Sequence, residues 1–173
     1  IINDNFKIVK GVINTIHAYT NDQRLADVSH KDLRRSRAAA ENIIPTSTGA
    51  ARAVGRVLPE LDGKLDGIAC RVPVSDGSAV DLFVEVEQKI DILEFNQLIE
   101  STSKTDSFKN ILEYSESPIV STDIIGNSKS SIYDASGTNV INDKYLRTLN
   151  WYDNEWGYSN RVVDLVDLVE KFI

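Results

Sequence analysis

The 173-residue sequence contains very little cysteine, since Cys70 is the only one. A single cysteine cannot form a disulfide within the chain, so we expect a cytoplasmic setting and not a disulfide-rich secreted domain. No apolar stretch approaches the roughly 18 residues that a membrane span needs. The start shows no basic and apolar leader of the kind typical of secreted proteins, although a sequence that opens at Ile1-Ile2 without an initiator Met leaves a leader open. The sequence therefore predicts no membrane span and shows no secretory signal.

Histidine is almost as rare, and the usual ligand motifs are missing. His17 and His30 are the only histidines, and neither has the paired spacing with Cys70 that predicts a metal site. The patterns GxGxxG and GxxxxGKS, which cradle nucleotide phosphates, do not occur. The net charge is −7, whereas nucleic-acid-binding proteins are usually basic. We expect no bound metal and no nucleic-acid partner.

The sequence does contain clear helix and strand signals. Residues 80–86 alternate strictly between inward apolar and outward, mostly acidic residues, which predicts a half-buried strand. Further strands are expected at 9–17, 65–73, 119–125, 130–135 and 147–152. Helices are expected as the tail of one at 1–6, and at 50–58, around 95–99, around 108–112 and from 162 to the end. Because helices and strands do not alternate regularly, we predict an α+β fold with a largely antiparallel sheet.

Three short segments carry residues suited to catalysis or anion binding. His17 ends a predicted strand, where it is either a general base near neutral pH or a hydrogen-bonded structural residue. Thr48 and Gly49 open a predicted helix, whose free N–H groups favour an anion, although an ordinary helix cap has the same residues. Arg71 ends another strand and is either a surface residue or, in a cleft, a ligand of phosphate or carboxylate.

A fourth segment, Trp151–Tyr158, holds both tryptophans and two of the six tyrosines. It is interpreted either as a hydrophobic hinge between sheet and helix or as a ring-binding surface with Asn154 as a directing amide. Residues 18–37 form a polar stretch without periodicity, which is long for a loop and indicates either a function or a wrongly assigned element. Residues 30–37 place four of the 19 basic residues just before the candidate anion site at Thr48.

Read together, these segments resemble phosphorylating glyceraldehyde-3-phosphate dehydrogenase. The order and approximate spacing hold over essentially the whole chain, which corresponds to the latter half of a full-length member, its C-terminal catalytic domain. The resemblance implies a glycolytic oxidoreductase that converts glyceraldehyde 3-phosphate and inorganic phosphate to 1,3-bisphosphoglycerate with NAD, through a cysteine thioester. The matching segments are His17–Thr20, Ser29–Arg35, Ile43–Ala51, Val57–Leu61, Arg71–Pro73 and Trp151–Arg161.

The resemblance also implies a role for each candidate residue. His17 corresponds to the catalytic histidine, which activates the thiol and moves a proton. The implied binding residues are Thr20 and Arg71 for the phosphate of the substrate, Arg35, Thr48 and Gly49 for the attacking phosphate, and Asn154 for the nicotinamide carboxamide.

The resemblance implies two parts, a catalytic domain at residues 1–153 with helices on one face of its sheet, and a C-terminal helix at 154–173. In the family that helix returns to the NAD-binding domain. Residues 18–39 correspond to a segment at the core of a cytoplasmic homotetramer, where it also lines the cofactor pocket. The family's nucleophile segment, Ser-Cys-Thr-Thr-Asn, would precede Ile1, as would most of the NAD site. We therefore expect this chain alone to be inactive, and we do not expect Cys70 to replace the nucleophile.

Two alternatives stay open. An erythrose-4-phosphate dehydrogenase is related, but typically departs from the His-Ala-Tyr-Thr and Ser-Thr-Gly-Ala patterns that are kept here. A non-catalytic interaction module derived from the family is the other alternative. The preference for NAD over NADP also stays open, because the residue that reads the ribose would lie outside these residues.

Overall fold

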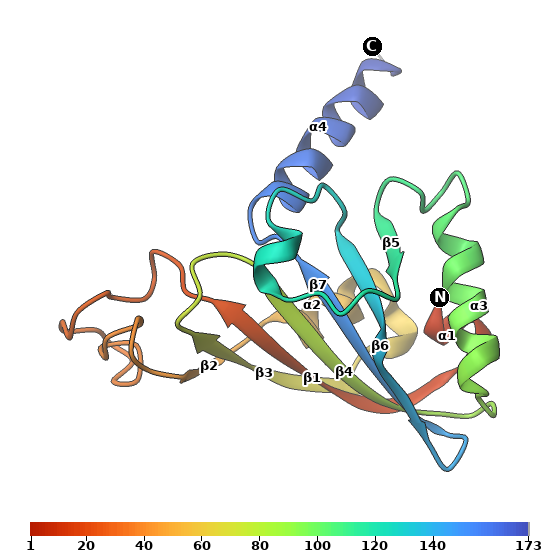
Figure 1. Ribbon diagram of the computed structural model, residues 1–173, viewed down its shortest axis with the longest axis horizontal. Helices are drawn as coiled ribbons and strands as arrows, with labels where there is room; N and C mark the ends of the chain where they lie inside the picture. Colours follow the sequence, from red (N-terminus) through yellow and green to blue (C-terminus); the bar gives the residue numbers. More distant parts are fainter. Residues whose placement is uncertain (173) are drawn as a thin grey trace.

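A single mixed sheet organises the chain in the computed structural model, which describes residues 1–172 (Figure 1). Its strands are β1 (Ile8–Ala18), β2 (Ile44–Ser47), β3 (Leu65–Val72), β4 (Ser78–Val86), β5 (Leu112–Ser115), β6 (Ser131–Ile141) and β7 (Tyr145–Tyr152). The helices are α1 (Ile2–Phe6), α2 (Ala50–Val57), α3 (Ile92–Ser103) and α4 (Trp156–Glu170), with 3₁₀ turns at Pro59–Leu61 and Ser121–Ile124.

The strand order is β2-β3-β1-β4-β7-β6-β5. Strand β1 pairs with β3 in parallel and with β4 in antiparallel fashion, and β5 and β6 form the other parallel pair. The remaining pairs, β2–β3, β4–β7 and β6–β7, are antiparallel. The predicted α+β class with a largely antiparallel sheet is confirmed.

The core lies between one face of the sheet and the first three helices, which together line an apolar cavity against it. Phe95 of α3 is fully buried, and its ring packs edge-on against Phe6 at 5.7 Å and Tyr133 at 6.0 Å between ring centroids. On the opposite face, Val12 of β1 and Ile68 of β3 are about half exposed. The sheet is therefore buried on one side and carries exposed apolar side chains on the other.

Two predicted elements are wrong. Residues 108–112 are turns followed by β5, because Ile111 N–H bonds back to the Phe108 carbonyl and Leu112 then pairs with Ser131 of β6. Residues 119–125 are not a strand but contain a 3₁₀ turn. There, the Asp123 carboxylate accepts from the Val120 N–H at 2.7 Å, and such local side-chain bonds compete with sheet pairing.

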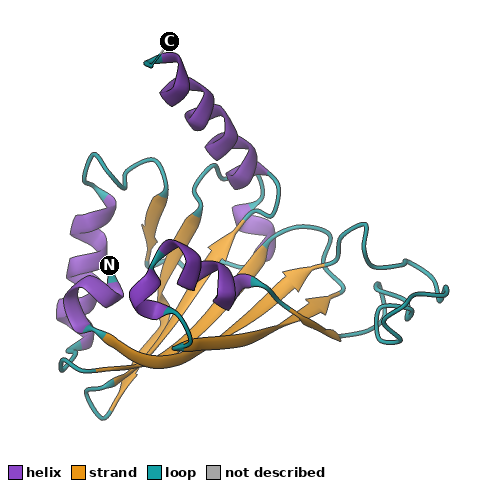
Figure 2. Cartoon of the chain, turned by 180° about the vertical axis from the view of Figure 1, so that it is seen from behind, coloured by secondary structure: helices purple, strands orange, loops and turns teal. Residues whose placement is uncertain are grey.

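Helix α4 projects away from the sheet in both views (Figures 1 and 2). Gly157 is the residue of α4 that is buried, while apolar side chains along the rest of the helix are exposed. Asp153 fixes the start of the helix, since its Oδ1 accepts from the N–H groups of Glu155 and Trp156. Across residues 1–172, no helix combines the length and the apolar character that crossing a membrane requires.

Candidate functional site

His17 and Arg71 meet at the carboxyl ends of the parallel strands β1 and β3, where they are direct register partners. Because successive residues of a strand point to opposite faces, paired residues of neighbouring strands share a face. Arg71 Nη1 lies 2.9 Å from His17 Nδ1 and donates to the Ala18 carbonyl at 3.3 Å. The structure thus brings together two residues that are 54 positions apart in the chain.

Two contacts at His17 Nδ1 favour opposite tautomers. The Ala18 carbonyl, 2.7 Å away, accepts a proton held on Nδ1, whereas Arg71 Nη1, 2.9 Å away, can only donate to an Nδ1 lone pair. In the tautomer with the proton on Nδ1, His17 donates to the carbonyl and keeps the lone pair on Nε2. In that tautomer, Nε2 is the nitrogen that can accept a proton from a substrate or thiol.

Burial lowers the pKa of His17 below its ordinary value of 6.5. The Ala18 carbonyl opposes this shift, the positive charge of Arg71 adds to it, and the charge of Glu155 opposes it. The net direction keeps His17 neutral at pH 7, which is the state a general base needs.

The Nε–H group of Arg71 is an unsatisfied hydrogen-bond donor. This nitrogen is buried and has no partner within residues 1–172. Burial lowers the pKa of Arg71, and the nearby charge of Arg35 lowers it further, although the guanidinium stays charged. Buried donors are normally satisfied, so an anion is a natural complement to this side chain.

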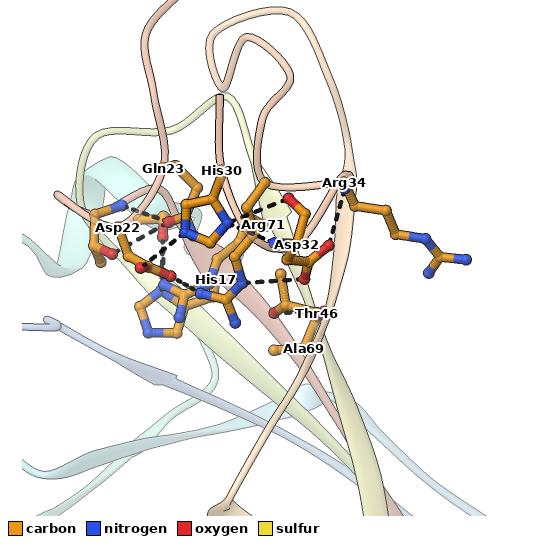
Figure 3. A network of polar contacts seen from close by, with 12 residues as sticks. His17, Asp22, Gln23, His30, Asp32, Arg34, Thr46, Ala69 and Arg71 are labelled. Atoms are coloured by element: carbon orange, nitrogen blue, oxygen red, sulfur yellow. Dashed lines mark hydrogen bonds and ion pairs between the residues drawn. The ribbon is translucent and has the colours of Figure 1, made fainter. Parts of the chain in front are cut away.

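The connection between β1 and β2, residues 19–43, is held by its own polar contacts (Figure 3). Arg35 pairs with Asp22 and, at 3.4 Å, with Asp32. His30 lies 3.7 Å from Asp22 through Nε2 and accepts from the Asp32 N–H at 2.9 Å through Nδ1. The sequence indicated a basic cluster here, but not that two carboxylates hold Arg35.

Thr20 follows the end of β1 and is turned toward Gln23. Both its N–H and its hydroxyl donate to Gln23 Oε1, at 2.9 and 3.2 Å. One cavity is lined by residues 19–25 together with Ser75 and Glu155. Thr20 therefore borders a hollow that reaches the start of α4.

Thr48 and Gly49 lie farther along the chain from the His17–Arg71 pair. Ile44 of β2 is the register partner of Arg71, so Thr48 is four residues away, roughly 13 Å along an extended strand. Thr48 Oγ1 accepts from the Ala50 N–H at 3.1 Å, and a Cβ on Gly49 would meet nothing within 4 Å. No hydrogen bond in the described part of the chain joins these two residues to His17 or Arg71.

Asn154 follows β7 and is anchored at both ends. Its N–H donates to Asp76 at 3.3 Å, and its Oδ1 accepts from the Ser78 hydroxyl. Its Nδ2 has no protein partner among residues 1–172. A free amide donor of this kind fits the carbonyl oxygen of a carboxamide ligand.

Tyr152 belongs to the same cluster, although the sequence gave no separate signal for it. Its ring packs edge-on against His17, with centroids 6.0 Å apart and planes at 86°. Burial raises the pKa of Tyr152, and the Ser78 hydroxyl and the charge of Arg71 oppose that rise. An aromatic wall therefore limits the freedom of the His17 ring.

Cys70 lies next to Arg71 in β3, so its side chain points to the opposite face of the sheet. It is a free thiol and is partly exposed. Its direct partner in β1 is Ile16, not His17. The thiol is therefore turned away from the basic nitrogen.

In the described residues, no group of three or more His, Cys, Asp or Glu could hold a metal ion.

The fold and this cluster define an α+β domain with a neutral histidine and an arginine gathered at one end of its sheet. The family model for "Glyceraldehyde 3-phosphate dehydrogenase, C-terminal domain" matches residues 1–154. The chain belongs to this family.

Curated relatives agree with the family model. Glyceraldehyde-3-phosphate dehydrogenase of Streptomyces coelicolor is 56% identical over 169 residues, which are 98% of this chain and 50% of the relative. The protein of that name from Mycolicibacterium smegmatis is 55% identical over 171 residues, or 99% and 50%. The one from Borreliella burgdorferi is 54% identical over 172 residues, or 99% and 51%. The chain thus spans about half the length of the curated relatives it matches.

Proposed function

We propose that this chain is the catalytic portion of an NAD-dependent, phosphorylating glyceraldehyde-3-phosphate dehydrogenase of glycolysis. The observation that carries the proposal is the contact between His17 and Arg71, which sets a neutral base beside a cation with a spare donor. The names of the family and of the relatives supply the substrate, glyceraldehyde 3-phosphate. The second reactant, inorganic phosphate, is the one that the resemblance to the phosphorylating enzyme implies.

His17 acts as the general acid–base. Nε2 takes the proton of a cysteine thiol that attacks the aldehyde, and the charged imidazolium later returns a proton when inorganic phosphate cleaves the thioester. The family supplies that cysteine from a segment outside these residues. The Ala18 carbonyl favours the tautomer with the proton on Nδ1, and Tyr152 restrains the ring.

Arg71 binds the phosphate of the substrate together with Thr20, and Arg35, Thr48 and Gly49 serve the attacking phosphate. The buried Nε of Arg71 supports its role directly. Arg35 is occupied by Asp22 and Asp32, so phosphate competes with these carboxylates for the guanidinium. Gly49 has open space before it, which lets an anion approach the start of α2.

NAD, when bound, accepts the hydride of the aldehyde. This chain contributes Asn154, whose free Nδ2 donates to the carboxamide of the nicotinamide. Exposed apolar residues on the outer face of β1 and β3 and on α4 support a homo-oligomer, a tetramer in the family. Because the thiol lies outside these residues, the chain alone is expected to be inactive.

The test replaces His17 in a full-length protein that carries this chain. His17→Asn should lower kcat by roughly 10²- to 10⁴-fold, the usual contribution of a positioned acid–base, with little change in substrate binding. Cys70→Ser is the matched control and should keep wild-type turnover, since its thiol faces away from His17. Near wild-type kcat in His17→Asn would reject the role. Assaying glyceraldehyde 3-phosphate beside erythrose 4-phosphate separates the two related dehydrogenases.

A further inference from the structure

We propose that Ser78 is a positioning residue that holds the Asn154 amide in one orientation, with its NH₂ group toward the cofactor. The inference rests on the proposed function, which assigns Asn154 to the nicotinamide. It adds a residue that the sequence did not single out and predicts which atom of the carboxamide is recognised.

Ser78 occupies the first position of β4, between β1 and β7, and is only 1% exposed. Its Oγ accepts from the Ala18 N–H at 3.0 Å and donates to Asn154 Oδ1. One buried hydroxyl therefore joins the end of β1, which carries the candidate base, to the candidate cofactor residue.

The contact with Ser78 orients the amide. The Ser78 hydroxyl accepts from the Ala18 N–H and has one proton to give. Asn154 Oδ1 faces this hydroxyl and can only accept, so the carbonyl end of the amide is satisfied inside the protein. The backbone of Asn154 is held separately by Asp76, which leaves rotation of the side chain as the freedom that Ser78 removes.

This orientation of the Asn154 amide selects one atom of the carboxamide ligand. With Oδ1 occupied, Asn154 offers only N–H donors to a ligand and recognises the carbonyl oxygen of the carboxamide, not its amine. An analogue in which an acetyl group replaces the carboxamide keeps that carbonyl and should keep the contact with Asn154. Without Ser78 the amide can turn over, and its NH₂ group is no longer directed at the ligand.

The experiment measures binding in a full-length protein that carries this chain, by calorimetric titration with NAD⁺ and with ADP-ribose, which lacks the nicotinamide. Ser78→Ala should raise the Kd for NAD⁺ about 2- to 12-fold, the range of one net hydrogen bond, and leave the Kd for ADP-ribose unchanged. Ser78→Cys keeps nearly the same volume with a weak donor, and it should shift the NAD⁺ affinity in the same direction even if Ser78→Ala does not fold.

A double-mutant cycle separates positioning from a general structural effect. If Ser78 acts through Asn154, the double variant should bind NAD⁺ no more weakly than Asn154→Ala alone. The acetylpyridine analogue of NAD⁺ should lose affinity in Ser78→Ala as NAD⁺ does.

Equal losses for NAD⁺ and ADP-ribose, or additive losses in the cycle, would overturn the inference. A loss in Asn154→Ala without one in the Ser78 variants would overturn it while leaving the proposed function intact. No loss in Asn154→Ala would refute the cofactor role of Asn154 and this inference with it.

Discussion

Replacing Arg71 by glutamine is the sharpest test of the anion site, because the guanidinium has two separable roles. Its Nη1 contacts His17 and the Ala18 carbonyl, while its buried Nε has no partner within residues 1–172. We expect Nε and a second N–H to bind the phosphate of the substrate. Glutamine removes the charge and the planar fork but keeps a polar side chain of moderate size.

The magnitude follows from charge-assisted hydrogen bonds, each of which contributes about 1.5–3 kcal/mol. Two such bonds to one phosphate are not additive, so we expect a loss of about 2–4 kcal/mol. That corresponds to a fall in kcat/KM for glyceraldehyde 3-phosphate of roughly 30- to 1,000-fold. Arg71→Lys should fall between wild type and Arg71→Gln, because lysine keeps the charge and loses the fork.

The assay compares glyceraldehyde 3-phosphate with glyceraldehyde, which has no phosphate, in a full-length protein that carries this chain. Arg71→Gln should reduce kcat/KM for the phosphorylated aldehyde and change the other much less. Arg56→Gln is the control, since Arg56 is an exposed arginine of α2. Equal losses for both aldehydes would refute the reasoning, because they would show that Arg71 acts on His17 or the fold and not on the phosphate.

Three further predictions concern His17, Gly77 and Asp153. Because the base must be unprotonated, kcat/KM in a pH–rate profile should fall as the pH drops through the lowered pKa of His17. The charge of Glu155 raises that pKa, so Glu155→Gln should move the fall in kcat/KM to lower pH. In denaturant unfolding, Gly77→Ala should destabilise the protein more than Gly63→Ala does. Both glycines have positive φ, but a Cβ on Gly77 would lie 2.2 Å from a backbone oxygen, whereas a Cβ on Gly63 would lie in open space. Asp153→Ala should lower the free energy of unfolding by about 2–4 kcal/mol, because three backbone N–H groups lose their acceptor; an unchanged denaturation midpoint would contradict this.

The sequence predicted the elements whose pattern is set by burial. The strict alternation at 80–86 became β4, and the final apolar stripe became α4, because each follows the period of its own element. The prediction failed at 119–125, where a strand was expected and the chain forms a 3₁₀ turn. There, the turn is decided by the contact of Asp123 with the Val120 N–H, a local bond that no periodicity reports.

The candidate site could be predicted only in part for a similar reason. His17 and Arg71 were each ambiguous alone, and their contact depends on the pairing of β1 with β3, which a single sequence does not specify. Ser78 carried no signal at all, because serine is common and its importance comes from three-dimensional neighbours. Thr48 illustrates the opposite case: its helix-start pattern was correct, yet the hydroxyl bonds within its own turn.

Strand direction explains why these residues gather at one end of the sheet. Because β1 and β3 are parallel, His17 and Arg71 both lie near the ends of their strands; an antiparallel pairing of the same eight positions would separate them by roughly 17 Å. Strand β4 runs against both β1 and β7, so it begins where they end. Its first residue, Ser78, thereby reaches Ala18 and Asn154, which are 60 and 76 positions away.

The parallel pairing has a second consequence, because a parallel pair requires a long crossover connection. Here the crossover between β1 and β3 includes the polar connection 19–43, β2 and α2, and it carries Arg35, Thr48 and Gly49. The crossover that the parallel pairing of His17 and Arg71 requires is thus also the segment that carries the proposed ligands of the attacking phosphate. The proposed base, substrate anchor and second phosphate site are therefore all carried by the parallel pair and the crossover that joins it.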